Sequence, residues 1–73
     1  MTEVTSDHAV VRRRINDLAE LHDTATVDEI VAGVSRDLGV ADATVIEELD
    51  RMERNGFVYL VPTESDGQEV RLP

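Results

Sequence analysis

The chain has 73 residues and a mass of 8.1 kDa, which is enough for one small domain with its own hydrophobic core. It contains no cysteine, so disulfide bonds, thiolate metal sites and thiol nucleophiles are excluded. No apolar run approaches the roughly 20 residues of a membrane span, and the N-terminal sequence MTEVTSDH lacks the basic and apolar regions of a secretory signal. We therefore expect a soluble, cytoplasmic protein that is too small for a two-domain enzyme.

The charge is strongly negative. The chain contains sixteen acidic residues, seven arginines and no lysine, and its formal net charge is −9. An acidic surface repels phosphate, which opposes strong non-specific binding of nucleic acid. The same composition resembles that of proteins from salt-loving microbes, and at molar salt the Debye length falls to about 3 Å. Under those conditions the charge would say much less about the partners of the protein.

The N-terminal region predicts a first helix. Residues 1–5 have nothing to pack against and are expected to be disordered, so that a single domain spans residues 6–73. Ser6 and Asp7 offer N-cap chemistry for a helix that runs to about His22, and Arg13 is expected to pair with Asp17 at i,i+4. Spacings of four, three and four place four residues on its buried face: Val11, Ile15, Leu18 and His22.

The sequence TVDE predicts the start of a second helix, because Thr26 and Glu29 have the spacing of a capping box. Gly33 lies inside this helix at a cost of about 1 kcal/mol relative to alanine, which a closely crossing helix would explain. Gly39 is the expected left-handed stop. The apolar stripe of the helix consists of Val27, Ile30, Val31, Val34 and Leu38.

A third helix is predicted from Ala41 or Asp42 to Asn55, with Asn55-Gly56 as its terminator. Its buried stripe consists of Val45, Leu49 and Met52. The β-rich run 57–61 and the alternating run 68–72 flank an Asp-Gly turn signal, which predicts a hairpin. The order of three helices and a hairpin, with a short turn between the second and third helices, predicts a mainly α fold: a winged helix-turn-helix with a two-stranded wing.

The segment LGVADATVIEELDRMERNGFV resembles the winged helix-turn-helix superfamily, and the resemblance covers about residues 8–72. Within it the chain is most similar to the C-terminal domain of archaeal minichromosome maintenance helicases, in its VVRRRI, VDEI, VIEELDRMERNG and GFVYxxP segments. It departs from that family at Leu60 and Val61 and in its longer TESDGQ turn, and it contains no ATPase phosphate loop. The resemblance implies a DNA-associated role in replication or transcription regulation, and a small free-standing regulator fits the same residues.

Catalysis is not expected from this sequence. His8 and His22 stand at opposite ends of one predicted helix, too far apart to share a metal ion. Glu47 and Glu48 are adjacent helix residues, so their side chains diverge by about 100° and do not form a carboxylate pair. No nucleophile has a base at a recognisable spacing. We predict that the protein is not an enzyme and has no metal, cofactor or small-molecule substrate.

A DNA-reading winged helix would use its third helix for recognition. The exposed positions of that helix are expected to be Asp42, Ala43, Glu47, Asp50 and Arg54. Three of these are acidic, whereas base readout depends mainly on Arg, Lys, Asn and Gln, and the wing tip carries Glu64, Asp66 and Glu69. Any contact with duplex DNA is therefore expected to be weak and to involve the phosphate backbone. The predicted contact residues are Arg12, Arg51, Arg54 and Arg71.

A protein partner or a homodimer is the other possibility. Ile46 lies at the margin of the buried stripe, and one face of the first wing strand is apolar. A patch of Ile46, Phe57 and Tyr59 would dock another subunit, unless these residues are packed in the core. The sequence thus predicts a non-catalytic winged-helix module of a DNA-associated regulatory or replication protein. The alternative is a protein-interaction or homodimerising winged helix that has lost DNA reading.

Overall fold

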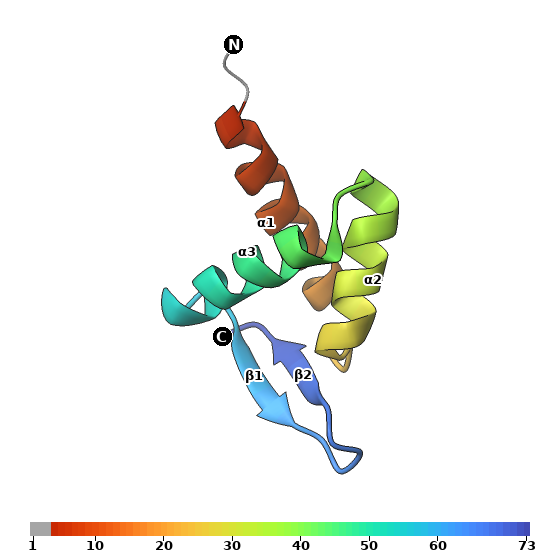
Figure 1. Cartoon of the computed structure of the whole chain (residues 1–73). Helices are drawn as coiled ribbons and strands as arrows, with labels where there is room; N and C mark the ends of the chain where they lie inside the picture. Colours follow the sequence, from red (N-terminus) through yellow and green to blue (C-terminus); the bar gives the residue numbers. More distant parts are fainter. Residues whose placement is uncertain (1–3) are drawn as a thin grey trace.

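The structure, a computed structural model, describes residues 4–73, with burial and side-chain contacts described from His8 onward. It has the winged-helix layout (Figure 1). Three helices, α1 (Val4–Leu21), α2 (Val27–Leu38) and α3 (Asp42–Arg54), precede two antiparallel strands, β1 (Tyr59–Pro62) and β2 (Gln68–Arg71). The predicted fold, mainly helical with a C-terminal hairpin, is confirmed. None of the helices in this part of the chain is long and apolar enough to cross a membrane.

Helix α1 differs from its prediction at both ends. It begins at Val4, before the expected cap at Ser6 and Asp7, because nothing in the sequence from Val4 onward breaks a helix. Residues 1–3 of the predicted disordered segment lie outside the described residues, and residues 4 and 5 belong to α1. At the other end His22 lies beyond the helix and is exposed, so its place on the buried face was predicted wrongly.

The buried face of α1 consists of Val11, Ile15 and Ala19, at spacings of four, with Leu18 half-buried beside them. The predicted ion pair between Arg13 and Asp17 is not formed within 4 Å, although both side chains belong to the described region. Such an exposed pair stabilises a helix by only about 0.2–0.5 kcal/mol, and the order with the acid N-terminal to the base is the better one. Here the arginine comes first, so little holds the two side chains together.

The predicted capping box and helix stop of α2 are confirmed. Thr26 Oγ1 accepts a hydrogen bond from the Glu29 N–H (3.2 Å), and Glu29 Oε1 accepts one from the Thr26 N–H (3.0 Å). Gly39 follows the helix in the left-handed region, with a φ of 68°, and its N–H donates to the Ser35 carbonyl. The Ser35 hydroxyl also donates to the Val40 carbonyl (2.6 Å), which fastens the turn between α2 and α3.

Helix α3 ends in a Schellman motif, as its Asn-Gly terminator indicates. Gly56 has a φ of 80°, and its N–H donates to the Glu53 carbonyl. The Phe57 N–H donates to the Met52 carbonyl at 2.9 Å. Because this closure uses the backbone of Phe57, β1 begins only at Tyr59, two residues later than predicted.

One core joins the three helices and the hairpin. Helix α2 buries Ile30, Val31 and Val34, and α3 buries Val45, Leu49 and Met52, as the stripes predicted. Gly33 also lies inside this core, and a Cβ atom added to it would stand 3.2 Å from Leu18 Cδ1 of α1. The glycine therefore lies where α1 and α2 pack closely, which explains its position inside a helix.

The hairpin pairs Tyr59 with Arg71 and Pro62 with Gln68. Its connection differs from the predicted Asp-Gly turn: Asp66, with a φ of 73°, is in the left-handed region, and Gly67 is not. The Thr63 N–H donates to the Gly67 carbonyl (2.9 Å), so that three residues, 64–66, form the connection. This is the longer hairpin class in which a left-handed residue ends the loop.

The wing is also paired with the segment between α1 and α2, which the sequence did not predict. Thr26 forms an antiparallel bridge with Glu69, and the Val70 N–H donates to the Ala25 carbonyl (2.9 Å). In Figure 1, β2 accordingly lies on the side of the hairpin that is nearer α2. The wing is thus held against the helices by its own backbone as well as by the buried Val70.

Candidate interaction surfaces

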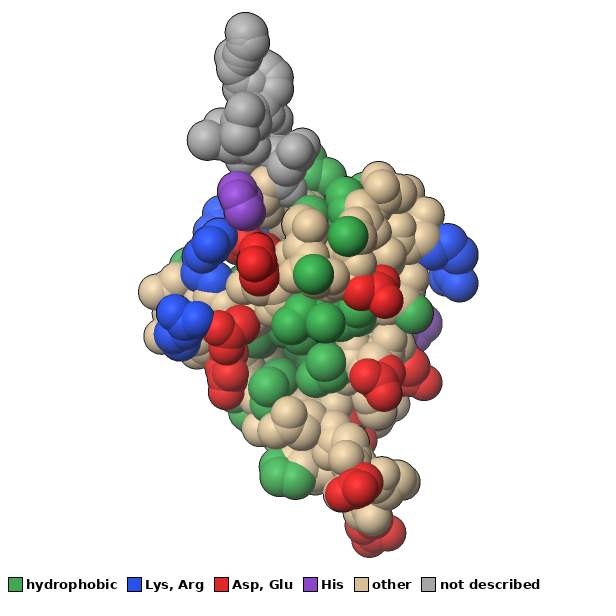
Figure 2. All heavy atoms as spheres, in the orientation of Figure 1, with side chains coloured by type: hydrophobic (Ala, Val, Ile, Leu, Met, Phe, Trp, Pro, Cys, Tyr) green, Lys and Arg blue, Asp and Glu red, His purple; other side chains and the backbone are tan. Residues whose placement is uncertain are grey.

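The outer face of α3 is acidic. Its exposed residues include the five predicted ones, Asp42, Ala43, Glu47, Asp50 and Arg54. Figure 2 shows red and blue side chains side by side at one end of the visible face, and acidic side chains at the tip of the wing. A recognition helix with this face offers few donors to the bases or phosphates of DNA.

Both basic side chains of α3 are paired with carboxylates of the same helix. Arg54 Nη2 donates to Asp50 Oδ2 across one turn, where both side chains are exposed. Arg51 Nη1 donates to Glu48 Oε1 at 2.9 Å. A phosphate would have to compete with these carboxylates for each guanidinium, so neither arginine is free to add much binding energy.

Glu48 is the one buried charged residue among those whose burial is described, and its side chain is only 4% exposed. Besides Arg51, its Oε1 lies 3.3 Å from His8 Nδ1 of α1. Glu48 was considered from the sequence only as one of two adjacent carboxylates, and its burial was not predicted. The i,i+3 spacing from Arg51 was the available signal, but nothing in the sequence brings His8 to the same place.

The basic residue of the wing is paired as well. Arg71 donates to Glu69 Oε1 from both Nε (3.0 Å) and Nη2 (2.7 Å). The hydrogen bond and the charge of Glu69 raise the pKa of Arg71 above its ordinary value. Three of the four predicted phosphate contacts, Arg51, Arg54 and Arg71, are therefore already bound to acids.

Arg12 is different from the other three. Its guanidinium carbon lies 5.4 Å from the centroid of the Phe57 ring, which is a cation–π contact between α1 and the turn after α3. No carboxylate of the described side chains lies within 4 Å of it. The four arginines thus come from α1, α3 and β2, and among them Arg12 alone has no ion pair with a described side chain.

Ile46, Phe57 and Tyr59, the predicted apolar patch, are 51%, 49% and 48% exposed. They are not packed in the core. The Phe57 ring faces α1, since it lies under Arg12 and lines a hollow together with Met52. Ile46 is about 120° around α3 from Met52 at 100° per residue. Phe57 and Ile46 are therefore on different sides of α3, and the three residues do not line one hollow.

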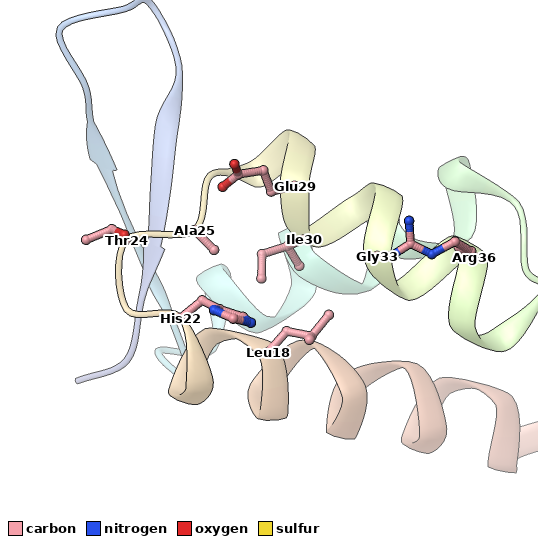
Figure 3. A pocket seen from close by; sticks show the side chains of 8 residues that line it. All are labelled: Leu18, His22, Thr24, Ala25, Glu29, Ile30, Gly33 and Arg36. Carbon is pink, nitrogen blue, oxygen red and sulfur yellow. The ribbon is translucent and has the colours of Figure 1, made fainter.

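A hollow of about 470 Å³ lies between the end of α1 and α2 (Figure 3). Leu18 and Ile30 point toward one another in it, and His22, Glu29 and Arg36 lie around it. The polar groups do not converge: the Glu29 carboxylate is bound to the Thr26 N–H and does not point at the His22 ring. Among the residues whose side chains are described, no group of three metal-ligating side chains occurs. This hollow therefore lacks the convergent chemistry of an active site.

A second hollow, of about 440 Å³, lies between α1 and the end of α3. Its lining consists of Ala9, Arg12, Arg13, Asn16, Met52 and Phe57. It combines two guanidinium groups with an exposed aromatic ring and has no acidic residue in its lining. Its charge is thus opposite to that of the protein as a whole.

Comparisons of this chain with protein-family models, with curated proteins and with solved structures found no match.

Proposed function

We propose that this chain is a non-catalytic winged-helix module of a DNA-associated regulatory or replication protein, and that it does not read base sequence. Its own contact with DNA is weak and limited to the phosphate backbone. The observation that carries this proposal is the pairing of Arg51 and Arg54 with carboxylates on α3, the helix that a winged-helix reader inserts into the major groove. The resemblance to the C-terminal domain of archaeal minichromosome maintenance helicases supports the same context.

The contact with DNA is weak because each paired arginine would have to exchange its carboxylate partner for a phosphate. Moving a guanidinium from a carboxylate to a phosphate replaces one charge-assisted hydrogen bond by another, so the net gain is small. Releasing Arg51 would also leave Glu48, with a side chain only 4% exposed, with one polar partner fewer. Asp42 and Glu47 on the same helix, which are exposed and have no ion pair with a described side chain, add repulsion. The remaining unpaired cation among the four predicted contacts is Arg12, which is on α1.

A titration with random-sequence duplex DNA tests the proposal. Fluorescence anisotropy is followed from low to molar KCl, and the logarithm of the affinity is expected to fall with that of the salt concentration with a slope of about −1 to −2. Arg12→Gln should weaken binding more than Arg54→Gln, because Arg54 is neutralised by Asp50. Absence of binding at every salt concentration contradicts the DNA association. A steeper slope, or a preference for one sequence, contradicts the absence of base reading.

A protein-interaction role is the second candidate, and the half-exposed Phe57, which lines the basic hollow beside α1, favours it. Sedimentation velocity of the wild type and of Ile46→Ser and Tyr59→Ser tests the homodimeric form of this role. A dimer that either serine variant disrupts supports it. A monomer at every concentration contradicts the homodimer, and the protein-interaction role would then require a different protein as the partner.

A further inference from the structure

The hollow between α1 and the turn after α3 has a basic wall and an apolar floor. Ala9, Arg12, Arg13 and Asn16 recur at i, i+3, i+4 and i+7, so they form one stripe along about 10 Å of α1. Met52, which is buried, and the half-exposed Phe57 face this stripe from α3 and the turn behind it. No acidic residue contributes to the lining, although the chain carries sixteen of them.

The two arginines of this hollow are available to a ligand. Arg12 and Arg13 have no carboxylate within 4 Å among the described side chains, unlike the arginines of α3 and the wing. The guanidinium carbon of Arg12 lies 5.4 Å from the centroid of the Phe57 ring, and a cation–π contact does not occupy the N–H donors, which remain for a ligand. The contact also restrains the side chain before a ligand binds, which lowers the entropy lost on binding.

We infer that this hollow docks an extended acidic segment of a partner protein, one in which an apolar side chain is flanked by carboxylates. The carboxylates would accept hydrogen bonds from Arg12 and Arg13, and the apolar side chain would pack on the Phe57 ring and over Met52. This inference rests on the protein-interaction candidate, and its hollow shares Arg12 with the proposed phosphate contact.

Other occupants fit less well. A phosphate backbone would gain from the two guanidinium groups but not from the apolar floor. A second copy of the chain would present an acidic wing tip, but that contact is head-to-tail, so it does not close into a dimer. An acidic and apolar segment uses both the wall and the floor.

Fluorescence anisotropy with a fluorescein-labelled peptide of sequence EDELFDEE tests the inference at about 0.15 M KCl, where the Debye length is about 8 Å. The control peptide EDESSDEE keeps the charge and lacks the apolar side chains. We expect saturable binding of the first peptide and at least severalfold weaker binding of the second. Amide chemical shifts in ¹⁵N-labelled protein should change at Ala9, Asn16 and Phe57.

Variants of the protein locate the contact. Arg12→Gln should weaken binding of the first peptide about tenfold, the value of one charge-assisted hydrogen bond, and Arg12→Gln/Arg13→Gln should weaken it further. Arg36→Gln is the matched control, because Arg36 is 79% exposed on α2, far from this lining, and has only a 3.9 Å contact with Asp37. Circular dichroism verifies that each variant is folded.

Four outcomes would overturn the inference: no saturable binding, equal binding of the two peptides, an equal loss in Arg36→Gln, or shift changes confined to other residues. Equal binding of the two peptides, together with duplex binding that Arg12→Gln/Arg13→Gln abolishes, would instead assign the hollow to phosphate. The duplex titration and the sedimentation experiment are separate measurements. Failure of the peptide to bind therefore leaves their results, and the proposed function, unaffected.

Discussion

The carboxylate of Glu48 lies 3.3 Å from Nδ1 of His8, so that a charge in the middle of α3 is held against α1. Arg51 Nη1 approaches the same oxygen at 2.9 Å. A buried carboxylate is costly unless it is paired and hydrogen-bonded, and here both partners are half-exposed. The cluster of His8, Glu48 and Arg51 therefore links the two helices next to the proposed docking hollow.

Arg51→Met is expected to destabilise the fold by about 1–3 kcal/mol, because it leaves the buried Glu48 carboxylate with His8 alone. Arg54→Met is the control. Its partner Asp50 is exposed, and the loss should stay below about 1 kcal/mol. Urea denaturation followed by circular dichroism measures both. The double change Glu48→Leu/Arg51→Met should recover most of the stability, since it removes the buried charge. Equal losses of stability in Arg51→Met and Arg54→Met would show that the burial of Glu48 does not increase the cost of removing its arginine partner.

Gly33→Ala is expected to change the free energy of unfolding little. The gain in helix propensity, about 1 kcal/mol, is offset because Leu18 must move away from a 3.2 Å contact with the new methyl group. Gly33→Leu should destabilise by about 1–3 kcal/mol through overpacking. Ala32→Gly at the adjacent exposed position measures propensity alone in the same helix. If Gly33→Ala gains as much as Ala32→Gly loses, the close packing of α1 and α2 at this position is refuted.

Gly39→Ala and Gly56→Ala should each cost about 1–2 kcal/mol, because both residues have positive φ angles and a side chain is strained there. Gly67→Ala provides the comparison. Its φ is not positive, and its new Cβ atom would lie 3.6 Å from Thr63 Oγ1, an ordinary contact. We expect a change within about 0.5 kcal/mol for this variant. Chemical denaturation of the three variants checks the ranking, which equal tolerance at the three positions would contradict.

The protein is expected to melt at a higher temperature in molar KCl than at low salt, because screening weakens the repulsion of a net charge of −9. The variant Glu47→Gln/Glu53→Gln/Glu64→Gln removes three exposed acids that have no ion pair among the described side chains. It should show a smaller salt effect. Calorimetry across the KCl range measures the melting temperatures. A flat profile for the wild type would argue against adaptation to high salt.

Local patterns predicted most of the fold. The capping box of Thr26 and Glu29, the left-handed stop at Gly39 and the Schellman end at Gly56 each involve residues within a few positions of one another. The same is true of the apolar stripes of α2 and α3, which follow from the helical repeat alone. The turn of the wing was less predictable, because Asp and Gly both tolerate the left-handed region and the structure uses Asp66.

The candidate surfaces were predicted less completely. Arg12 was predicted to contact DNA and Phe57 to contact a protein, whereas in the structure the two side chains form a cation–π contact. Arg51 and Arg54 were predicted as free cations, although their acids stand three and four positions away on the same helix. That pairing was within reach of helix geometry. The contact of Arg12 with Phe57 was not, since it depends on how α1 crosses the end of α3.

The amino-acid sequence by itself determined the three helices, the ends of α2 and α3, the hairpin and the acidic outer face of α3, because these features depend on neighbours along the chain. Tertiary structure alone decided that Glu48 is buried beside His8 and that the wing pairs with the segment between α1 and α2. It also created the basic hollow that combines Arg12 and Arg13 with Phe57. His8 and Arg51 are 43 positions apart in the sequence. Only the packing of α1 against α3 brings their side chains within hydrogen-bonding distance of one another.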